Sequence, residues 1–239
     1  MIQHSQTPLA LCLFTNRFAA LVEEGFSLVR TFSLLEDVPE PYGEDAKRLR
    51  ELVESGDSIS HAMSERPDLY SSYYVHMIRA GEVGGILDVL LRRSADIITK
   101  ECQFMNRWST REAAFFFAAP SAQEQPDNWG DLSQYQRTVI QLLFCETLGT
   151  ILGSGVPILR SLGVVRWLLP KVQAERLDEA KEGIAAGERM NPGRLGMLPA
   201  CIVALIEEGE EAGTLNSTLL RCAEILETEL DLRVAQAAA

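Results

Sequence analysis

The apolar residues of this chain recur at the spacing of helices rather than of strands. Near the N-terminus, Leu13, Phe14, Phe18, Leu21 and Val22 share one face of a helix. Stripes of the same kind predict further helices at about 28–35, 43–55, 59–63, 71–80 and 85–104. No useful stretch alternates apolar and polar residues with the two-residue period of a strand. The pattern therefore predicts an all-α protein.

Glycines mark the ends of these predicted helices. Gly25, Gly56 and Gly81 each follow a helical stripe, and glycine readily adopts the left-handed conformation that ends a helix. After Gly81, the closing helix is expected to begin near Gly85. Glu82 is then expected between the two helices, at the N-terminus of the closing one.

The order of stripes and glycines is repeated in the second half of the chain. Residues 80–87 read Ala-Gly-Glu-Val-Gly-Gly-Ile-Leu and residues 208–215 read Glu-Gly-Glu-Glu-Ala-Gly-Thr-Leu, an offset of 209 − 81 = 128. Further upstream the offset is 155 − 25 = 130, and in the middle it is 187 − 56 = 131. The candidate motif residues are Gly25, Gly56, Gly81, Glu82, Gly85, Gly155, Gly187, Gly209, Glu210 and Gly213.

A motif set that recurs together with its helices indicates an internal duplication. We expect two tandem homologous six-helix modules, residues 8–105 and 138–232, joined by a linker over residues 106–137. Within the linker, residues 112–117 are expected to continue a helix. Residues 120–128 are expected to form an exposed loop, because they are polar and contain helix breakers.

The composition argues against some classes of function. The 239 residues carry a formal net charge of −12, which argues against a nucleic-acid partner because phosphate binding needs a basic surface. The five cysteines are scattered without metal-ligand spacing, which is typical of reduced, buried thiols. No signal peptide is recognisable, and the best apolar run, residues 113–119, is far shorter than the ~18 residues of a membrane span.

Two glutamates are the polar residues with the clearest alternative roles. Glu82 and Glu210 occupy the same motif position, where a carboxylate either caps a helix or serves as a partner contact or a cation ligand, and capping is the simpler interpretation. The acidic residues within 207–211 lack the alternating ligands of a calcium loop and are expected to form a solvated face. His61 and His76 fall on different helices without convergent partners. The sequence thus predicts no metal site, no cofactor and no catalytic centre.

The motifs resemble those of the bacterial type II secretion F-protein family, which includes inner-membrane platform proteins of type II secretion and type IV pilus assembly. The matching segments are Leu21–Leu28, Val53–Ala62 and Arg79–Asp88, with Ile151–Ile158 and Glu207–Leu215 in the second copy. The resemblance implies cytoplasmic six-helix domains in a platform on which a hexameric ATPase drives pilin assembly. Family members interleave these domains with transmembrane helices, whereas the linker here is too short for two spans of about 20 residues each.

The resemblance therefore implies a cytoplasmic form without transmembrane helices, with peripheral attachment to the inner membrane as an option. We expect a non-enzymatic scaffold without cofactors that binds the assembly ATPase or other platform subunits, and a homodimer is a further option. Two alternatives stay open. One is a stand-alone helical adaptor or regulator with an unrelated protein partner. The other is a helical enzyme, which would need Glu82 or Glu210 in a pocket with a shifted pKa.

Overall fold

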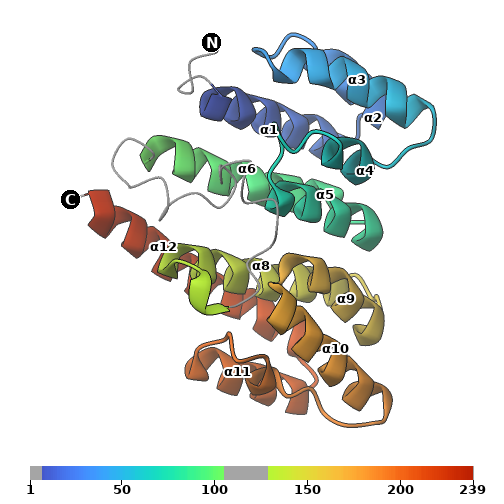
Figure 1. Ribbon diagram of the computed structural model, residues 1–239. Coiled ribbons are helices and arrows are strands. Elements are labelled where there is room, and N and C mark those ends of the chain that lie inside the picture. The colour runs from blue at the N-terminus through green and yellow to red at the C-terminus, as the bar shows by residue number, and fades with distance from the viewer. Residues whose placement is uncertain (1–6, 105–128, 239) are drawn as a thin grey trace. The chain divides into compact units, whose positions relative to one another are not determined.

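The computed structural model describes residues 7–104 and 129–238. These residues form eleven α-helices and three short 3-10 helices and contain no strand, so the predicted all-α class is confirmed for them (Figure 1). The chain divides into two compact units, whose described parts are residues 7–104 (the first unit) and residues 129–238 (the second unit). The expected helix at 112–117 and loop at 120–128 lie outside the described residues.

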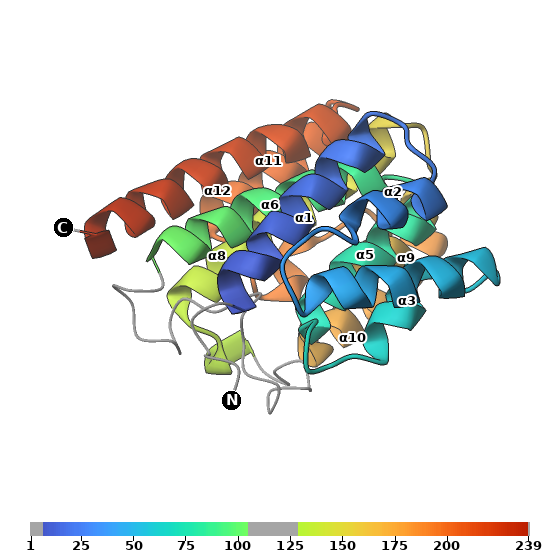
Figure 2. The same cartoon turned by 90° about the horizontal axis from the view of Figure 1, so that it is seen from above.

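In the described part of the first unit, the last helix packs against the first. Its elements are α1 (Thr7–Glu23), α2 (Leu28–Leu35), α3 (Tyr42–Glu54), α4 (Ile59–Ser64), α5 (Ser72–Gly84) and α6 (Leu87–Phe104). The opening helix α1 lies along the closing helix α6, and α2 packs on α3 (Figure 2). Helix α5 packs on both α4 and α6 (Figure 1). This arrangement buries Phe14 and Phe18 of the apolar stripe predicted for α1, whereas Leu13, Leu21 and Val22 are half-buried.

The second unit uses the same packing partners. Its elements are η1 (Trp129–Asp131), α8 (Gln134–Gly153), α9 (Ile158–Val165), η2 (Arg166–Leu168), α10 (Lys171–Ala185), η3 (Pro192–Leu195), α11 (Ala200–Glu211) and α12 (Leu215–Ala238). The opening helix α8 lies along the closing helix α12, α10 packs on α9, and α11 packs on α12. None of the described helices of either unit combines the length and apolarity needed to cross a membrane.

The element between α10 and α11, which stands where α4 stands in the first unit, differs from the expectation. Instead of an α-helix, the chain forms only the 3-10 helix η3 at this place. Gly193 disfavours continuation of a helix, and Gly196 follows in the left-handed conformation with φ 64. At the other end of the unit, α8 begins at Gln134, within the stretch expected to be linker.

The cores of the two units are filled differently. In the first unit, neighbouring aromatic rings have centroids between 5.1 and 6.2 Å apart, and the ring-bearing residues are Phe14, Phe18, Phe32, Tyr42, Tyr70 and Tyr74. In the second unit the positions that correspond to Phe18 and Phe32 at the offset of 130 hold the buried aliphatic residues Leu148 and Leu162. Core volume can be filled by different apolar side chains, so the glycines and glutamates match between the two units more closely than these core positions do.

The expected ends of α5 and of its counterpart α11 were wrong. Gly81 does not end α5, which continues to Gly84; the left-handed residue is Gly85, with φ 70. In the second unit α11 likewise passes Gly209, and the left-handed residue is Gly213, with φ 69. Glu82 and Glu210 therefore lie in the last turn of α5 and of α11, not at the start of the closing helices.

Candidate functional site

Glu82 caps a helix, but not the one expected. Its Oε1 accepts a hydrogen bond from the Ile59 backbone N–H at 2.6 Å, and its Oε2 accepts bonds from the backbone N–H and the hydroxyl of Ser60, at 3.2 and 2.5 Å. Ser58 accepts the next N–H, that of His61, at 3.2 Å. The first backbone donors of α4, which have no partner within the helix, are thus paired, and the carboxylate meets the positive end of the helix.

Glu210 makes the corresponding contact in the second unit. Its Oε1 accepts a hydrogen bond from the backbone N–H of Met190 at 2.9 Å. Met190 corresponds to Ile59 at the offset 190 − 59 = 131, which is the offset that relates Gly187 to Gly56. Glu82 therefore links the last turn of α5 to the first residue of α4, and Glu210 links the last turn of α11 to a residue two positions before η3. The second tie is the weaker one, with a single hydrogen bond.

The glycine before each glutamate permits close packing against the closing helix. A Cβ atom on Gly81 would lie 2.8 Å from the Cα of Leu87, and one on Gly209 would lie 2.5 Å from the Oγ1 of Thr218. Neither position has a left-handed backbone. These glycines are therefore needed for the close approach of two helices, next to the glutamates whose carboxylates bond to the backbone of Ile59 and of Met190.

The other six glycines of the motif end helices. Each has a positive φ, between 69 and 97, and the N–H of the following residue bonds to the carbonyl five positions earlier. This is the hydrogen-bond pattern of a glycine-terminated helix. The pairs are Gly25 with Gly155, Gly56 with Gly187, and Gly85 with Gly213.

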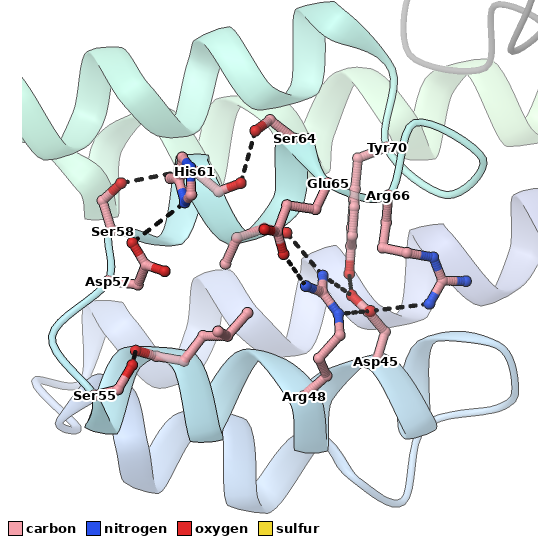
Figure 3. A network of polar contacts seen from close by, with 12 residues as sticks. Asp45, Arg48, Ser55, Asp57, Ser58, His61, Ser64, Glu65, Arg66 and Tyr70 are labelled. Carbon is pink, nitrogen blue, oxygen red and sulfur yellow. Dashed lines mark hydrogen bonds and ion pairs between the residues drawn. The ribbon is translucent and has the colours of Figure 1, made fainter.

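A buried carboxylate that sequence reasoning missed organises the opposite end of α4. The Asp45 side chain has 0% exposure and accepts hydrogen bonds from Tyr70 Oη and Arg48 Nε, both at 2.7 Å (Figure 3). Arg66 lies 3.4 Å from the same carboxylate. Arg48 also donates to the carbonyl of Ala62 at 2.8 Å, which ties α3 to the last turn of α4.

The electrostatics of this network favour a fixed structure over proton transfer. Burial raises the pKa of Tyr70 far above its usual value, and the negative charge of Asp45 adds to the effect. The phenol therefore stays protonated and serves as a hydrogen-bond donor. Asp45 directly precedes Ala46 on the inward stripe of α3, and a carboxylate on an apolar stripe was the signal that could have identified it.

The acidic residues around Glu210 border a hollow of about 330 Å³. Its lining mixes both charges and consists of Glu188, Arg189, Met190, Asn191, Arg194, Glu207, Glu210 and Glu211. Arg189 pairs with Glu211, and Arg194 lies 3.7 Å from Glu188. Across the two described ranges, no group of three or more His, Cys, Asp or Glu side chains is arranged to hold a metal ion.

The two histidines of the first unit occupy different environments. His61 is exposed in α4, and its Nδ1 lies 3.2 Å from the carboxylate of Asp57 (Figure 3). His76 lies in α5, where burial, assisted by the charge of Arg79, lowers its pKa to about 4. His76 is therefore neutral at physiological pH.

Comparison with protein families identifies a match over most of the chain. The family model described as type II secretion system protein F matches two stretches, residues 14–119 and residues 144–239.

Individual relatives come from secretion and pilus systems. The chain is 26% identical to the type II secretion system protein F of Xanthomonas campestris, covering 92% of this chain and 73% of the relative. It is 23% identical to the type IV pilus assembly protein PilC of Myxococcus xanthus, covering 94% of this chain and 72% of the relative. A third relative, PilC of Thermus thermophilus, is 32% identical over 41% of this chain and 24% of its own length. The Xanthomonas alignment spans 301 positions while covering 92% of the 239 residues here, so that relative has residues without a counterpart in this chain.

Proposed function

The chain belongs to the type II secretion system protein F family, and from that membership we propose that it is a platform component of a type II secretion or type IV pilus machine. In this role it acts as a non-enzymatic scaffold that holds partner proteins in place. The relatives named as a secretion-system protein F and as pilus assembly proteins support the role. The proposal puts the chain in the cytoplasm, attached peripherally to the inner membrane through the other platform subunits.

One observation carries the proposal. The family model matches the chain twice, and each match falls largely within one compact unit. We further propose that the two units are homologous modules of six helical elements. The equivalent hydrogen bonds of Glu82 to Ile59 and of Glu210 to Met190, together with the three pairs of left-handed glycines, support this duplication.

The partners that fit the scaffold are the cytoplasmic assembly ATPase, other platform subunits and a second copy of the chain. Helix α12 offers a surface for such contacts. Ile225 and Leu232 are seven residues apart, hence on one face of the helix, and are 43% and 61% exposed. Exposed apolar side chains that share a face are a common feature of protein interaction surfaces.

Binding between purified components tests the scaffold role. The full chain is immobilised, and the assembly ATPase and membrane platform subunits from the same cells are passed over it. We expect saturable binding of at least one of them, weakened about 10-fold or more by Ile225→Ser combined with Leu232→Ser, since buried apolar anchors carry much of the binding energy. Glu224→Gln, on the same helix and also exposed, is the matched control and is expected to bind like the unaltered chain. The absence of binding to every secretion and pilus component would refute the proposal, and selective binding of an unrelated protein would favour a stand-alone adaptor.

A separate experiment tests the duplication. Residues 1–110 and residues 124–239 are produced as separate chains, following the division into units. Each is expected to show helical circular dichroism and a cooperative thermal transition, because a module of about 100 residues can bury its own core. If either half is unfolded alone but folds when mixed with the other, the two units are one cooperative domain and the module proposal is wrong.

A further inference from the structure

Two cysteines meet where the opening and closing helices of the first unit pack. Cys12 lies in α1 and its Sγ is 3.5 Å from the hydroxyl of Thr99 in α6. Cys102, one turn beyond Thr99, donates from its Sγ to the carbonyl of Pro8 at 3.2 Å, and Pro8 is one turn before Cys12. The two thiols therefore occupy the same level of the interface between α1 and α6.

The surroundings shift the pKa values of the two thiols in opposite directions. The neighbouring thiol of Cys102, with hydrogen bonds from Thr99 and Asn16, lowers the pKa of Cys12 to about 6 against the opposing effect of burial. The pKa of Cys102 is raised by its proximity to Cys12, by burial and by the charges of Cys12 and Glu101. At neutral pH the pair thus consists of a thiolate at Cys12 and a thiol at Cys102, which is the arrangement of an attacking and a resolving cysteine.

The second unit contains an inert pair for comparison. Cys145 in α8 and Cys222 in α12 lie on the corresponding helices and are both fully buried. Burial raises the pKa of both thiols, and the charge of the neighbouring cysteine adds to the effect at Cys145. A thiol that is protonated and shielded from solvent reacts slowly with oxidants. The fifth cysteine, Cys201, is exposed.

We propose that Cys12 and Cys102 form a redox-active dithiol that hydrogen peroxide converts to a disulfide between α1 and α6. The Cys12 thiolate attacks one oxygen of the peroxide, the O–O bond breaks, and hydroxide leaves, so Cys12 becomes a sulfenic acid. The sulfur of Cys102 then attacks the sulfur of Cys12; the S–O bond breaks and water forms as Cys102 loses its proton. In sum, two thiols and one hydrogen peroxide give one disulfide and two waters.

The disulfide would close a loop that contains most of the first unit. The chain from residue 12 to residue 102 includes α2 to α5 completely. Oxidation would hold the opening helix on the closing helix, and reduction would return the unit to packing contacts alone. The site therefore couples the rigidity of the first unit to the oxidant level around it, independently of which partner the scaffold binds.

Oxidation of the full chain tests this directly. A Cys201→Ser variant removes the exposed thiol and leaves four cysteines. The reduced protein is treated with hydrogen peroxide, denatured, alkylated with N-ethylmaleimide and mapped by mass spectrometry. We expect the loss of two of the four alkylatable thiols, a peptide linked through Cys12 and Cys102, full alkylation of Cys145 and Cys222, and complete reversal by dithiothreitol. The reaction rate should rise with pH with a midpoint of about 6, the pKa of Cys12.

Two single variants separate the roles of the cysteines. In Cys102→Ser, peroxide is expected to leave Cys12 as a sulfenic acid that dimedone traps, and in Cys12→Ser, Cys102 is expected to stay reduced. The mapping of the parent protein does not depend on the stability of these variants. The proposal is wrong if peroxide leaves all four thiols alkylatable, if Cys145 and Cys222 become linked as fast as Cys12 and Cys102, or if Cys12 proceeds to a sulfinic acid while Cys102 stays free.

Discussion

The tie between Glu82 and α4 gives the sharpest prediction about stability. The carboxylate accepts three hydrogen bonds, from the N–H groups of Ile59 and Ser60 and from the Ser60 hydroxyl. A hydrogen bond to a charged group contributes about 1.5–3 kcal/mol, and loss of a helix cap costs about 0.5–2 kcal/mol. Because Glu82 is partly exposed, water can replace some of this stabilisation. We therefore expect Glu82→Ala to destabilise α4 by about 3 kcal/mol, and Glu82→Gln, which keeps one acceptor, by about 1–2 kcal/mol.

The second unit provides the matched comparison. Glu210 accepts only the Met190 N–H, so Glu210→Ala should cost about 1 kcal/mol. Native-state hydrogen exchange measures each effect at the amide concerned and does not require the whole chain to unfold in one step. Exchange at Ile59 and Ser60 should become about 100-fold faster in Glu82→Ala, and exchange at Met190 about 5-fold faster in Glu210→Ala, since 1.4 kcal/mol is tenfold.

The outcome that would refute this reasoning is equally specific. If Glu82→Ala leaves exchange at Ile59 and Ser60 unchanged, the carboxylate does not hold α4. If Glu210→Ala accelerates exchange at Met190 more than Glu82→Ala does at Ile59 and Ser60, the number of hydrogen bonds does not determine how much each glutamate stabilises its contact. A general increase of exchange across the whole first unit would show that Glu82 supports the fold globally rather than this one helix.

Three further changes probe the first unit. Asp45→Asn breaks a buried ion pair and should lower the free energy of unfolding by about 3 kcal/mol, measured by urea titration with circular dichroism. Gly81→Ala places a Cβ 2.8 Å from the Leu87 Cα and should lower the melting temperature, whereas Gly153→Ala, with its nearest atom at 3.6 Å, should not. Burial lowers the pKa of His76 to about 4 in the folded chain, from 6.5. Between pH 6.5 and pH 4 the unfolded chain therefore binds more protons than the folded chain, and the free energy of unfolding falls as the pH falls. His76→Gln should reduce this loss, measured by urea titrations at successive pH values.

The helical fold and most helix boundaries were predictable because they depend on local signals. The apolar stripes predicted the all-α class, and the helix predicted at about 43–55 differs from α3 (Tyr42–Glu54) by one residue at each end. The end of α5 was wrong because a glycine can serve either to end a helix or to admit a neighbour. Gly81 allows the close approach of the next helix, and only the position of Leu87 in three dimensions shows that it does not end α5.

The polar contacts were less predictable because their partners are distant in sequence. The capping role of Glu82 was anticipated, but its partner Ile59 lies 23 residues away. Asp45 and Tyr70 are 25 residues apart, and Cys102 meets residues of α1 that are 94 positions away. No spacing rule connects such pairs, so the cysteines were interpreted as scattered single thiols.

The central claim is that this chain works within a secretion or pilus platform, and cross-linking in living cells tests it most directly. A photo-activatable amino acid replaces exposed Val83 in α5 or exposed Ile225 in α12, with exposed Lys47 in α3 as the control position. Cross-linked partners are then identified by mass spectrometry. The account predicts that the assembly ATPase, platform subunits or a second copy of the chain is captured from Val83 or Ile225. Capture of proteins outside these systems, with no secretion or pilus component from any position, would contradict it.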